Sequence, residues 1–343
     1  MNKLILNTPR GNSEILVQEN GLSYVKEWIA EKHPNSRIVI ITDTNLGELY
    51  KNELAEVFTG TLTLSVPSGE DSKKLATVKQ LCNELINEGI TRSDVIIGFG
   101  GGMITDLVGF VASIYMRGIP FIAIPTSLLA MTDAAIGGKT GINLEAKNIL
   151  GTFHPAELIL LDVEFLNTLP DREFKSGLAE TIKHAVILDA SLANDLMKAE
   201  AELENLVMKS AQVKINVVES DPMESGLRKV LNFGHTFGHA IEQSSKFDLL
   251  HGEAIAIGMV ISNKVAQKLG KQSKETGKKI KEMLEKWKLP SEMPEGIKPE
   301  DLLNLIKMDK KRSGDNISFI IAPEMGKWEV VELSAEELID LVK

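Results

Sequence analysis

Three histidines gather within a short stretch of the second half of the chain, where they can bind a metal ion. His235 and His239 stand four residues apart in GHTFGHAIE, and His251 follows in LLHGEAIAIG. Neutral imidazole is the commonest metal ligand, and a helical i, i+4 pair can face one ion. A single histidine in an apolar helix is more often a core residue, but three beside glycines favour a metal site.

A catalytic metal ion also needs a carboxylate ligand and an open coordination position. Glu180 in GLAETIKHA is the candidate carboxylate, and Lys183 lies one turn further along the same helix face. The alternative interpretation of this pair is a surface salt bridge. A metal-assisted reaction on an oxygen-rich substrate is the chemistry that these residue types predict.

Glycines after an apolar strand indicate a second kind of site. The run Gly98–Gly102 precedes a helix expected over Met103–Met116, and free N–H groups at such a helix start favour a pyrophosphate. The strict G-x-G-x-x-G pattern is absent because residue 103 is Met, so an ordinary tight turn stays an alternative. A second glycine-rich turn, Gly137–Gly141, is expected after another strand and includes Lys139.

Polar residues near these elements can complete a dinucleotide and anion site. Asp43 ends an early strand and Asp106 follows the glycine run, so both can accept hydrogen bonds from ribose hydroxyls. Either residue alone is more often a helix cap or a surface charge. Four basic residues can form a local anion site, although most such side chains are simply solvated: Lys139, Lys147, Lys214 and Arg228.

The elements that must position these residues differ between the two halves of the chain. Short β-branched apolar runs alternate with amphipathic stretches in the first half, which predicts a doubly wound parallel sheet covered by helices on both faces. The expected strands are Arg37–Asp43, Thr61–Pro67, Asp94–Gly102, Phe121–Ser127 and Leu158–Asp162. This α/β domain, with a Rossmann-like sheet, is expected over residues 1–164.

Apolar residues recur every three or four positions in the second half, which predicts a mainly helical domain over residues 165–343. A small hairpin is expected within Ile317–Leu333, turning at Met325 and Gly326, before a last helix. The default place for a site is a cleft between two domains. The expected helices are Glu173–Leu188, Leu192–Glu219, Thr236–Gln243, Gly252–Leu269 and Lys274–Trp287.

Length and charge bound the classes of function. The 343 residues suffice for two packed cores, and 38 Lys and Arg against 48 Asp and Glu give a net charge of -10. Such a chain has no general basic field for nucleic acid or a membrane surface. The single cysteine, Cys82, and the absence of an apolar signal or a membrane-spanning run lead us to expect a cytoplasmic protein.

Several segments in sequence order resemble the 3-dehydroquinate synthase family of sugar-phosphate cyclases. They are GGGMITDLVGF, YMRGIPFIAIPTSLLAMTDAAIGGKTGIN, KNILGTFHP, LNTLPDREFKSGLAETIKH, LNFGHTFGHAIE and LLHGEAIAIGM. The resemblance covers almost the whole chain. It implies a nucleotide-binding α/β domain, a helical metal-binding domain, the cofactors NAD and one divalent ion (zinc, with cobalt as a substitute), and a homodimer.

The family's functional positions fall on particular residues of this chain. The implied metal ligands are Glu180, His235 and His251, with His239 contacting phosphate instead. The implied catalytic set is Lys183, Lys214, Arg228, Asn232 and His239. The implied substrate-binding set is Asp133, Lys139, Asn148, Arg117 from the neighbouring subunit, and Lys310 in preference to Lys311. The implied cofactor-binding set is Asp43, Asn45, Glu70, Lys73, Gly102, Asp106, Thr126, Ser127, Lys139, Lys147, Phe165 and Thr168.

The implied reaction converts 3-deoxy-D-arabino-heptulosonate 7-phosphate into 3-dehydroquinate and phosphate through transient oxidation by NAD. The alternatives are a cyclase acting on another sugar phosphate, an iron-type polyol dehydrogenase that releases NADH, and a catalytically inactive dinucleotide-binding protein. Three departures from the family pattern remove no required side chain: Ser127 replaces Thr, His154 replaces Gln, and the segment before Asn148 is one residue short.

Overall fold

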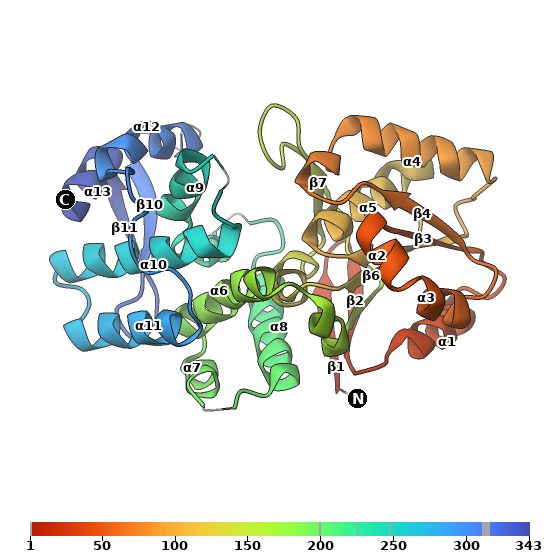
Figure 1. Ribbon diagram of the computed structural model, residues 1–343, viewed down its shortest axis with the longest axis horizontal. Helices are drawn as coiled ribbons and strands as arrows, with labels where there is room; N and C mark the ends of the chain where they lie inside the picture. The colour runs from red at the N-terminus through yellow and green to blue at the C-terminus, as the bar shows by residue number, and fades with distance from the viewer. Residues whose placement is uncertain (1, 199, 225, 247, 311–315) are drawn as a thin grey trace. The chain divides into compact units, whose positions relative to one another are not determined.

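The computed structural model describes residues 2–198, 200–224, 226–246, 248–310 and 316–343, without the side chains of 308–310. The chain forms two compact units (Figure 1). The first comprises Met1–Leu169 together with Lys214–Pro222, and the second comprises Pro170–Val213 together with Met223–Lys343. Within the described residues, no helix combines the length and apolar character needed to cross a membrane.

A seven-stranded sheet with the order β1-β2-β9-β6-β5-β3-β4 forms the centre of the first unit. Neighbouring strands are parallel except for the antiparallel pair β1 and β2. The five predicted strands are all present, and the N-terminal hairpin is additional. The strands are β1 (Asn2–Thr8), β2 (Gly11–Val17), β3 (Ile38–Asp43), β4 (Leu62–Val66), β5 (Val95–Gly100), β6 (Phe121–Pro125) and β9 (Leu158–Leu161).

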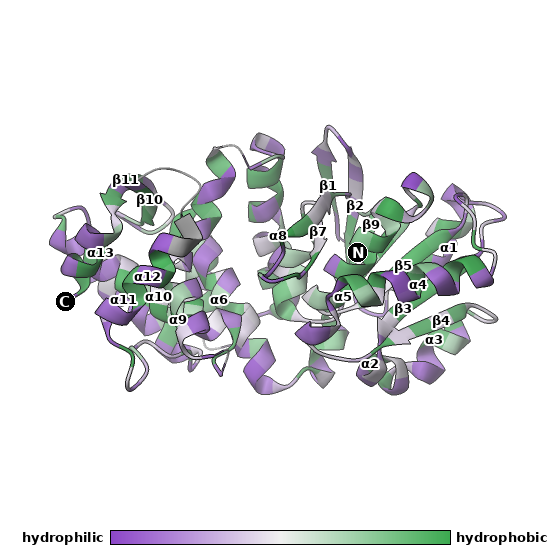
Figure 2. Ribbon diagram, turned by 90° about the horizontal axis from the view of Figure 1, so that it is seen from above, coloured by the Kyte–Doolittle hydropathy of each residue, from purple (hydrophilic) through white to green (hydrophobic). Residues whose placement is uncertain are grey.

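Helices cover both faces of this sheet, as the continuous apolar runs predicted. Every residue of β5 and β9 is buried, and Figure 2 shows both strands as mainly hydrophobic. Figure 1 shows α1 and α3 on one face, with α4 and α5 on the other. The helices are α1 (Leu22–Lys32), α2 (Thr44–Leu49), α3 (Lys51–Val57), α4 (Leu75–Asn87) and α5 (Gly102–Ile114).

A small hairpin packs against α5 and corrects one prediction. The run Gly137–Gly141 does not follow a strand, because the preceding element is the π-helical turn η3 (Ala130–Ala134). Its last residues form β7 (Lys139–Ile142), which pairs antiparallel with β8 (Leu150–Phe153). A Cβ added to Gly109 of α5 would lie 2.4 Å from the Thr140 methyl carbon, so glycine permits this close packing.

The second unit is built around the buried helix α10 (His251–Lys268), which packs against α6, α9, α11 and α13. The predicted hairpin is present as β10 (Asn316–Ile321) and β11 (Glu329–Ser334), and Gly326 in its turn has a φ of 75°. The other helices are α6 (Asp171–Ile187), α7 (Ala190–Leu196), α9 (His235–Ser244), α11 (Lys274–Lys286), α12 (Pro299–Lys310) and α13 (Ala335–Val342).

The prediction of one helix over Leu192–Glu219 is wrong, because the structure has two helices there. The first is α7, and the second is α8 (Leu203–Ser220), which runs from the second unit into the first. The Asp195 carboxylate of α7 accepts hydrogen bonds from Asn205 and Lys209 of α8. Residues ten and fourteen positions apart cannot meet on one straight helix, so these contacts stabilise the reversal of the chain.

Candidate active site

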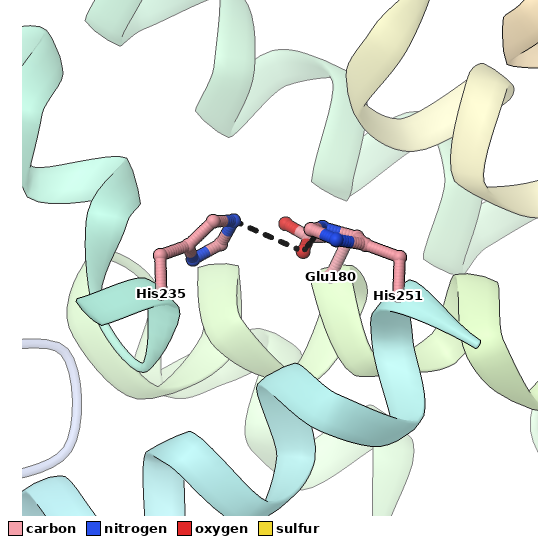
Figure 3. A group of neighbouring side chains, drawn as sticks. All are labelled: Glu180, His235 and His251. Atoms are coloured by element: carbon pink, nitrogen blue, oxygen red, sulfur yellow. Dashed lines mark ion pairs between the residues drawn. The ribbon is translucent and has the colours of Figure 1, made fainter. Parts of the chain in front are cut away.

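Three predicted metal ligands converge in the second unit (Figure 3). Glu180 comes from the middle of α6, while His235 and His251 are the first residues of α9 and α10. The Glu180 Oε1 atom lies 3.6 Å from His235 Nε2 and 3.5 Å from His251 Nε2. Tetrahedral zinc with bonds of about 2.0–2.1 Å needs ligand atoms about 3.3 Å apart, so the cluster fits a zinc-sized ion.

The second nitrogen of each histidine ring also has a partner. His251 Nδ1 lies 3.3 Å from Glu242 Oε2, and His235 Nδ1 lies 3.1 Å from the carbonyl oxygen of Phe233. Metal-binding histidines are commonly oriented by such outer partners, a carboxylate or a backbone carbonyl. Sequence reasoning missed Glu242, and its only signal was its place two helical turns after His235.

Charges of both signs surround this cluster. Burial and the nearby Lys183 ammonium hold the pKa of His235 well below its usual value. Burial also disfavours a charged His251, but hydrogen bonds to Glu180 and Glu242 outweigh it and raise the pKa of His251 to about 9. The two carboxylates thus favour positive charge at His251, whereas Lys183 opposes it at His235.

The ion pair of Lys183 with Glu180 is not a surface salt bridge, since both side chains are only 1% exposed. The His239 ring lies beside the Glu180–His235–His251 cluster, with its centroid 5.2 Å from that of His235 and 5.8 Å from that of His251. The group of candidate ligands consists of Glu180, His235 and His251. The expected pairing of His235 with His239 on one ion is therefore not what the structure shows. Arg228, buried, and Asn232 lie on the 3₁₀ turn η5 (Leu227–Asn232) just before α9.

The dinucleotide candidates of the first unit gather at the carboxyl ends of neighbouring strands. β4 lies on one side of β3 and β5 on the other, so the strand order reverses between β3 and β5. In a parallel sheet, this reversal is the usual place for a ligand crevice. Asp43 ends β3, and Gly102 opens α5 directly after β5. Asp43 also caps α2 by accepting hydrogen bonds from the backbone of Asn45 and Leu46.

Four further predicted cofactor positions follow strands β6 and β9 in the chain. Thr126 and Ser127 follow β6, and the backbone of Thr126 donates a hydrogen bond to Gly100. The buried Phe165 ring packs against the rings of Tyr50 and Phe99, which also contact each other, so its side chain belongs to the core. Thr168 shares a 2.7 Å hydrogen bond with the Tyr50 hydroxyl.

A polar network joins predicted cofactor and substrate residues within the first unit. Lys73, only 4% exposed, donates from Nζ to Asp106 and to Asn148, each at 2.6 Å. Glu70 lies on the 3₁₀ turn η1 (Glu70–Ser72) just before Lys73. The neighbouring Lys147 is exposed. Lys73 and Asp106 therefore form an ion pair. The hydrogen bond from Lys73 to Asn148 connects this pair to a predicted substrate residue.

The remaining predicted substrate residues occupy separate elements. Asp133 of η3 forms an ion pair with Lys214 of α8, and both belong to the first unit. Lys139 begins β7 and is exposed. Arg117 is exposed in a left-handed turn, with a φ of 68°, beside Met116 with a φ of 48°. The side chain of Lys310 lies outside the part of the chain that the structure describes, as does Lys311.

Fold and site together define a class of protein: a dinucleotide-type α/β unit followed by a helical metal-binding unit. A family model described as "3-dehydroquinate synthase N-terminal" matches residues 63–176, and one described as "3-dehydroquinate synthase C-terminal" matches residues 177–312. The 3-dehydroquinate synthase of Lactococcus lactis subsp. cremoris (strain SK11) is 40% identical, covering 99% of each chain. The chain belongs to the 3-dehydroquinate synthase family.

Two solved structures of related cyclases are also similar. A 2-deoxy-scyllo-inosose synthase in complex with carbaglucose-6-phosphate, NAD⁺ and Co²⁺ aligns with a TM-score of 0.90 and 25% identity, covering 99% of each chain. The 2-epi-5-epi-valiolone synthase of Streptomyces hygroscopicus, with NAD⁺ and Zn²⁺ bound, aligns with a TM-score of 0.86 and 27% identity, covering 98% of this chain and 97% of the other. The predicted fold class is confirmed.

Proposed function

We propose that the chain acts as a 3-dehydroquinate synthase, an NAD- and metal-dependent lyase of the shikimate pathway. It converts 3-deoxy-D-arabino-heptulosonate 7-phosphate into 3-dehydroquinate and phosphate. NAD would supply reversible hydride transfer at C5 within one turnover, and a divalent ion held by Glu180, His235 and His251 would supply Lewis-acid polarisation of substrate oxygens. The temporary C5 ketone acidifies the C6 proton so that phosphate can leave, and ring opening and an aldol closure then complete the product.

The observation that carries this proposal is the Glu180, His235 and His251 cluster, whose spacing fits a zinc-sized ion. Three protein ligands leave a coordination position for substrate oxygens, which distinguishes a catalytic site from a closed structural one. Lys183 and His239 lie directly beside the cluster. A lysine ammonium and an imidazole there suit a substrate that carries a carboxylate and a phosphate.

The proposed substrate-contacting residues form two sets with different roles. One set holds the carboxylate and ring hydroxyls, so that the reacting atoms are in place for each step; it comprises Lys183, Lys214, Arg228 and Asn232. Asp133, a further proposed substrate residue, forms an ion pair with Lys214. The other set fixes the phosphate, whose own oxygens are suited to removing the C6 proton; it comprises Lys139, Asn148, His239, Lys310 and Arg117 of the partner subunit. The residues that would hold the dinucleotide are Asp43, Asn45, Glu70, Lys73, Gly102, Asp106, Thr126, Ser127, Lys139, Lys147, Phe165 and Thr168.

The proposal includes a homodimer, because Arg117 is assigned to the neighbouring subunit's phosphate site. Its turn is well suited to presenting a side chain outward. Arg92 donates two hydrogen bonds to the Met116 carbonyl, at 2.7 and 3.2 Å. A non-glycine residue held in a left-handed conformation costs about 1–3 kcal/mol, and such costs are typical of functional positions.

One assay tests the proposed reaction. Zinc-loaded protein is incubated with NAD and 3-deoxy-D-arabino-heptulosonate 7-phosphate, while phosphate release and NADH absorbance are followed together. We expect many phosphates released per NAD and no net NADH. Steady accumulation of NADH would instead indicate a dehydrogenase, and phosphate release only from another sugar phosphate would indicate a different cyclase.

A further inference from the structure

Asn143, which follows β7, makes three hydrogen bonds to two separate segments of the first unit. Its backbone N–H donates to the Lys73 carbonyl at 2.8 Å, and its side-chain Nδ2 donates to Glu70 Oε1 at 2.7 Å. Its side-chain Oδ1 accepts from the backbone N–H of Asn148 at 2.8 Å. An asparagine amide offers a donor and an acceptor at once, and here both ends are used.

The segments that Asn143 joins carry residues of two different proposed roles. Glu70 and Lys73 belong to the proposed cofactor set, whereas Asn148 belongs to the proposed substrate set. Asn148 has a left-handed backbone with a φ of 57°. This conformation costs energy, and it persists where surrounding contacts compensate for that cost. Lys73 secures the Asn148 side chain from the other direction.

We propose that Asn143 is a positioning residue that fixes the cofactor residue Glu70 and the substrate residue Asn148 relative to each other. This inference rests on the proposed function, which assigns Glu70 to NAD and Asn148 to the substrate. The donor end of the amide orients the Glu70 carboxylate for the cofactor. The acceptor end holds the strained backbone of Asn148, so that its side chain is in place when the substrate arrives.

The donor end is tested by NAD affinity, measured by calorimetry without substrate. Asn143→Asp keeps an acceptor for Asn148 but removes the donor and places a second carboxylate against Glu70, so the dissociation constant for NAD should rise about tenfold. Glu70→Gln in the same chain supplies an amide that can donate to the new aspartate. Glu70→Gln alone should also weaken NAD binding, because the cofactor loses its carboxylate partner, so the test is the coupling between the two substitutions. Asn143→Asp should weaken NAD binding much less in the Glu70→Gln background than in the unsubstituted chain, which general damage to the fold would not permit.

The acceptor end is tested by steady-state kinetics at saturating NAD. Asn143→Ala removes the bond to Asn148, so KM for the sugar phosphate should rise about five- to tenfold. Asn143→Asp should leave this KM within about twofold of the unsubstituted protein. Leu144→Ala, at an exposed neighbouring position, is the matched control and should change neither quantity. The thermal midpoints of all variants are compared to detect loss of folding.

Unchanged NAD affinity in Asn143→Asp would overturn the donor role, and equal KM values for Asn143→Ala and Asn143→Asp would overturn the acceptor role. Failure of the proposed function gives a different result. In that case the unsubstituted protein releases no phosphate, while the calorimetric comparison of NAD affinities still tests the link between Asn143 and Glu70.

Discussion

Glu242 contacts one of the three candidate metal ligands. Its carboxylate lies near His251 Nδ1, whereas Glu180 lies near the other ring nitrogen, Nε2. Outer partners of this kind fix the ring orientation and raise the basicity of the ligand, and their loss usually costs about 10–100-fold in metal affinity. We expect Glu242→Ala to weaken zinc binding by this factor, measured by competition with a chromophoric chelator.

Glu242→Gln tests the same contact more gently, because the amide oxygen can still accept a hydrogen bond but carries no charge. Its zinc affinity should fall between those of the unsubstituted protein and Glu242→Ala. Gln243→Ala, exposed on the same helix, is the control and should bind zinc normally. Equal affinities for Glu242→Ala and Gln243→Ala would show that the carboxylate does not orient His251.

The sequence alone indicated the candidate metal ligands but not the residues that contact their outer ring nitrogens. Clustered histidines are rare, so their spacing and the family resemblance together led to Glu180, His235 and His251. A glutamate on an amphipathic helix and an asparagine in a loop are common and usually solvated. Glu242 and Asn143 become informative only when the fold brings His251 and Glu70 within hydrogen-bonding distance of them.

The contact between α9 and α10 depends on a glycine on each side. A Cβ added to Gly258 of α10 would lie 2.0 Å from the carbonyl oxygen of Gly234, which immediately precedes His235. Gly258→Ala should therefore push the start of α9 away, lowering the free energy of unfolding by about 1–3 kcal/mol and weakening zinc binding. Urea denaturation and chelator competition measure the two effects.

The control for this substitution is Lys264→Ala, at an exposed position of α10. Alanine is the better helix former, so this variant should unfold at an unchanged or slightly higher urea concentration. If Gly258→Ala lost stability but bound zinc normally, the α9–α10 contact would support the fold without positioning His235.

The reversal between α7 and α8 should depend on pH through Asp195. Hydrogen bonds from Lys198 and Lys209 hold the pKa of this carboxyl at about 2, below its ordinary value of 3.8. A depressed pKa means that the stabilisation is present at neutral pH and is lost as pH falls from about 4 toward 2. Asp195→Asn should cost about 1 kcal/mol at pH 7 after allowance for solvent screening.

Urea denaturation between pH 7 and pH 3 checks this prediction, since the difference between the two proteins should shrink at the acid end. A constant difference across that range would mean that the Asp195→Asn substitution acts for steric reasons and that charge plays no part. Lys279→Ala removes an ion pair on the exposed face of α11 and serves as the control, with little effect at any pH.

Elements with a strong hydrophobic period were predictable, and those defined by distant contacts were not. The buried strands β3, β5 and β6 and the helices α9, α10 and α11 agree with the sequence to within about two residues, the usual scatter of helix and strand ends. The break after α7 was missed because its stretch keeps a helical apolar period. What ends α7 is a set of side-chain contacts, and periodicity carries no information about them.

At the scale of the whole molecule, the proposed dimer predicts complementation between two inactive variants. Arg117→Ala lacks the residue that each subunit offers to its neighbour, and Lys183→Ala lacks one that each subunit uses itself. In a mixed dimer, the subunit carrying Arg117→Ala keeps its own Lys183 and receives Arg117 from its partner. Random re-association of equal amounts should thus restore about one quarter of the unsubstituted activity.

Phosphate release after partial unfolding and refolding of the mixture measures this recovery. Each variant treated alone is the control and should stay inactive. A mixture no more active than its components would mean that Arg117 serves its own subunit or that no shared site exists.

The first unit takes back residues Lys214–Pro222 after the chain has left it at Leu169. The ribosome therefore makes 169 residues of this unit and then an intervening stretch before supplying the piece that carries Lys214, the partner of Asp133, and Glu219, which accepts hydrogen bonds from Asn7. At about 5–20 residues per second, the nascent unit waits several seconds for its last part. During that interval the incomplete unit exposes surface that chaperones can bind. A gene split after Leu169 would leave its first product permanently without residues Lys214–Pro222.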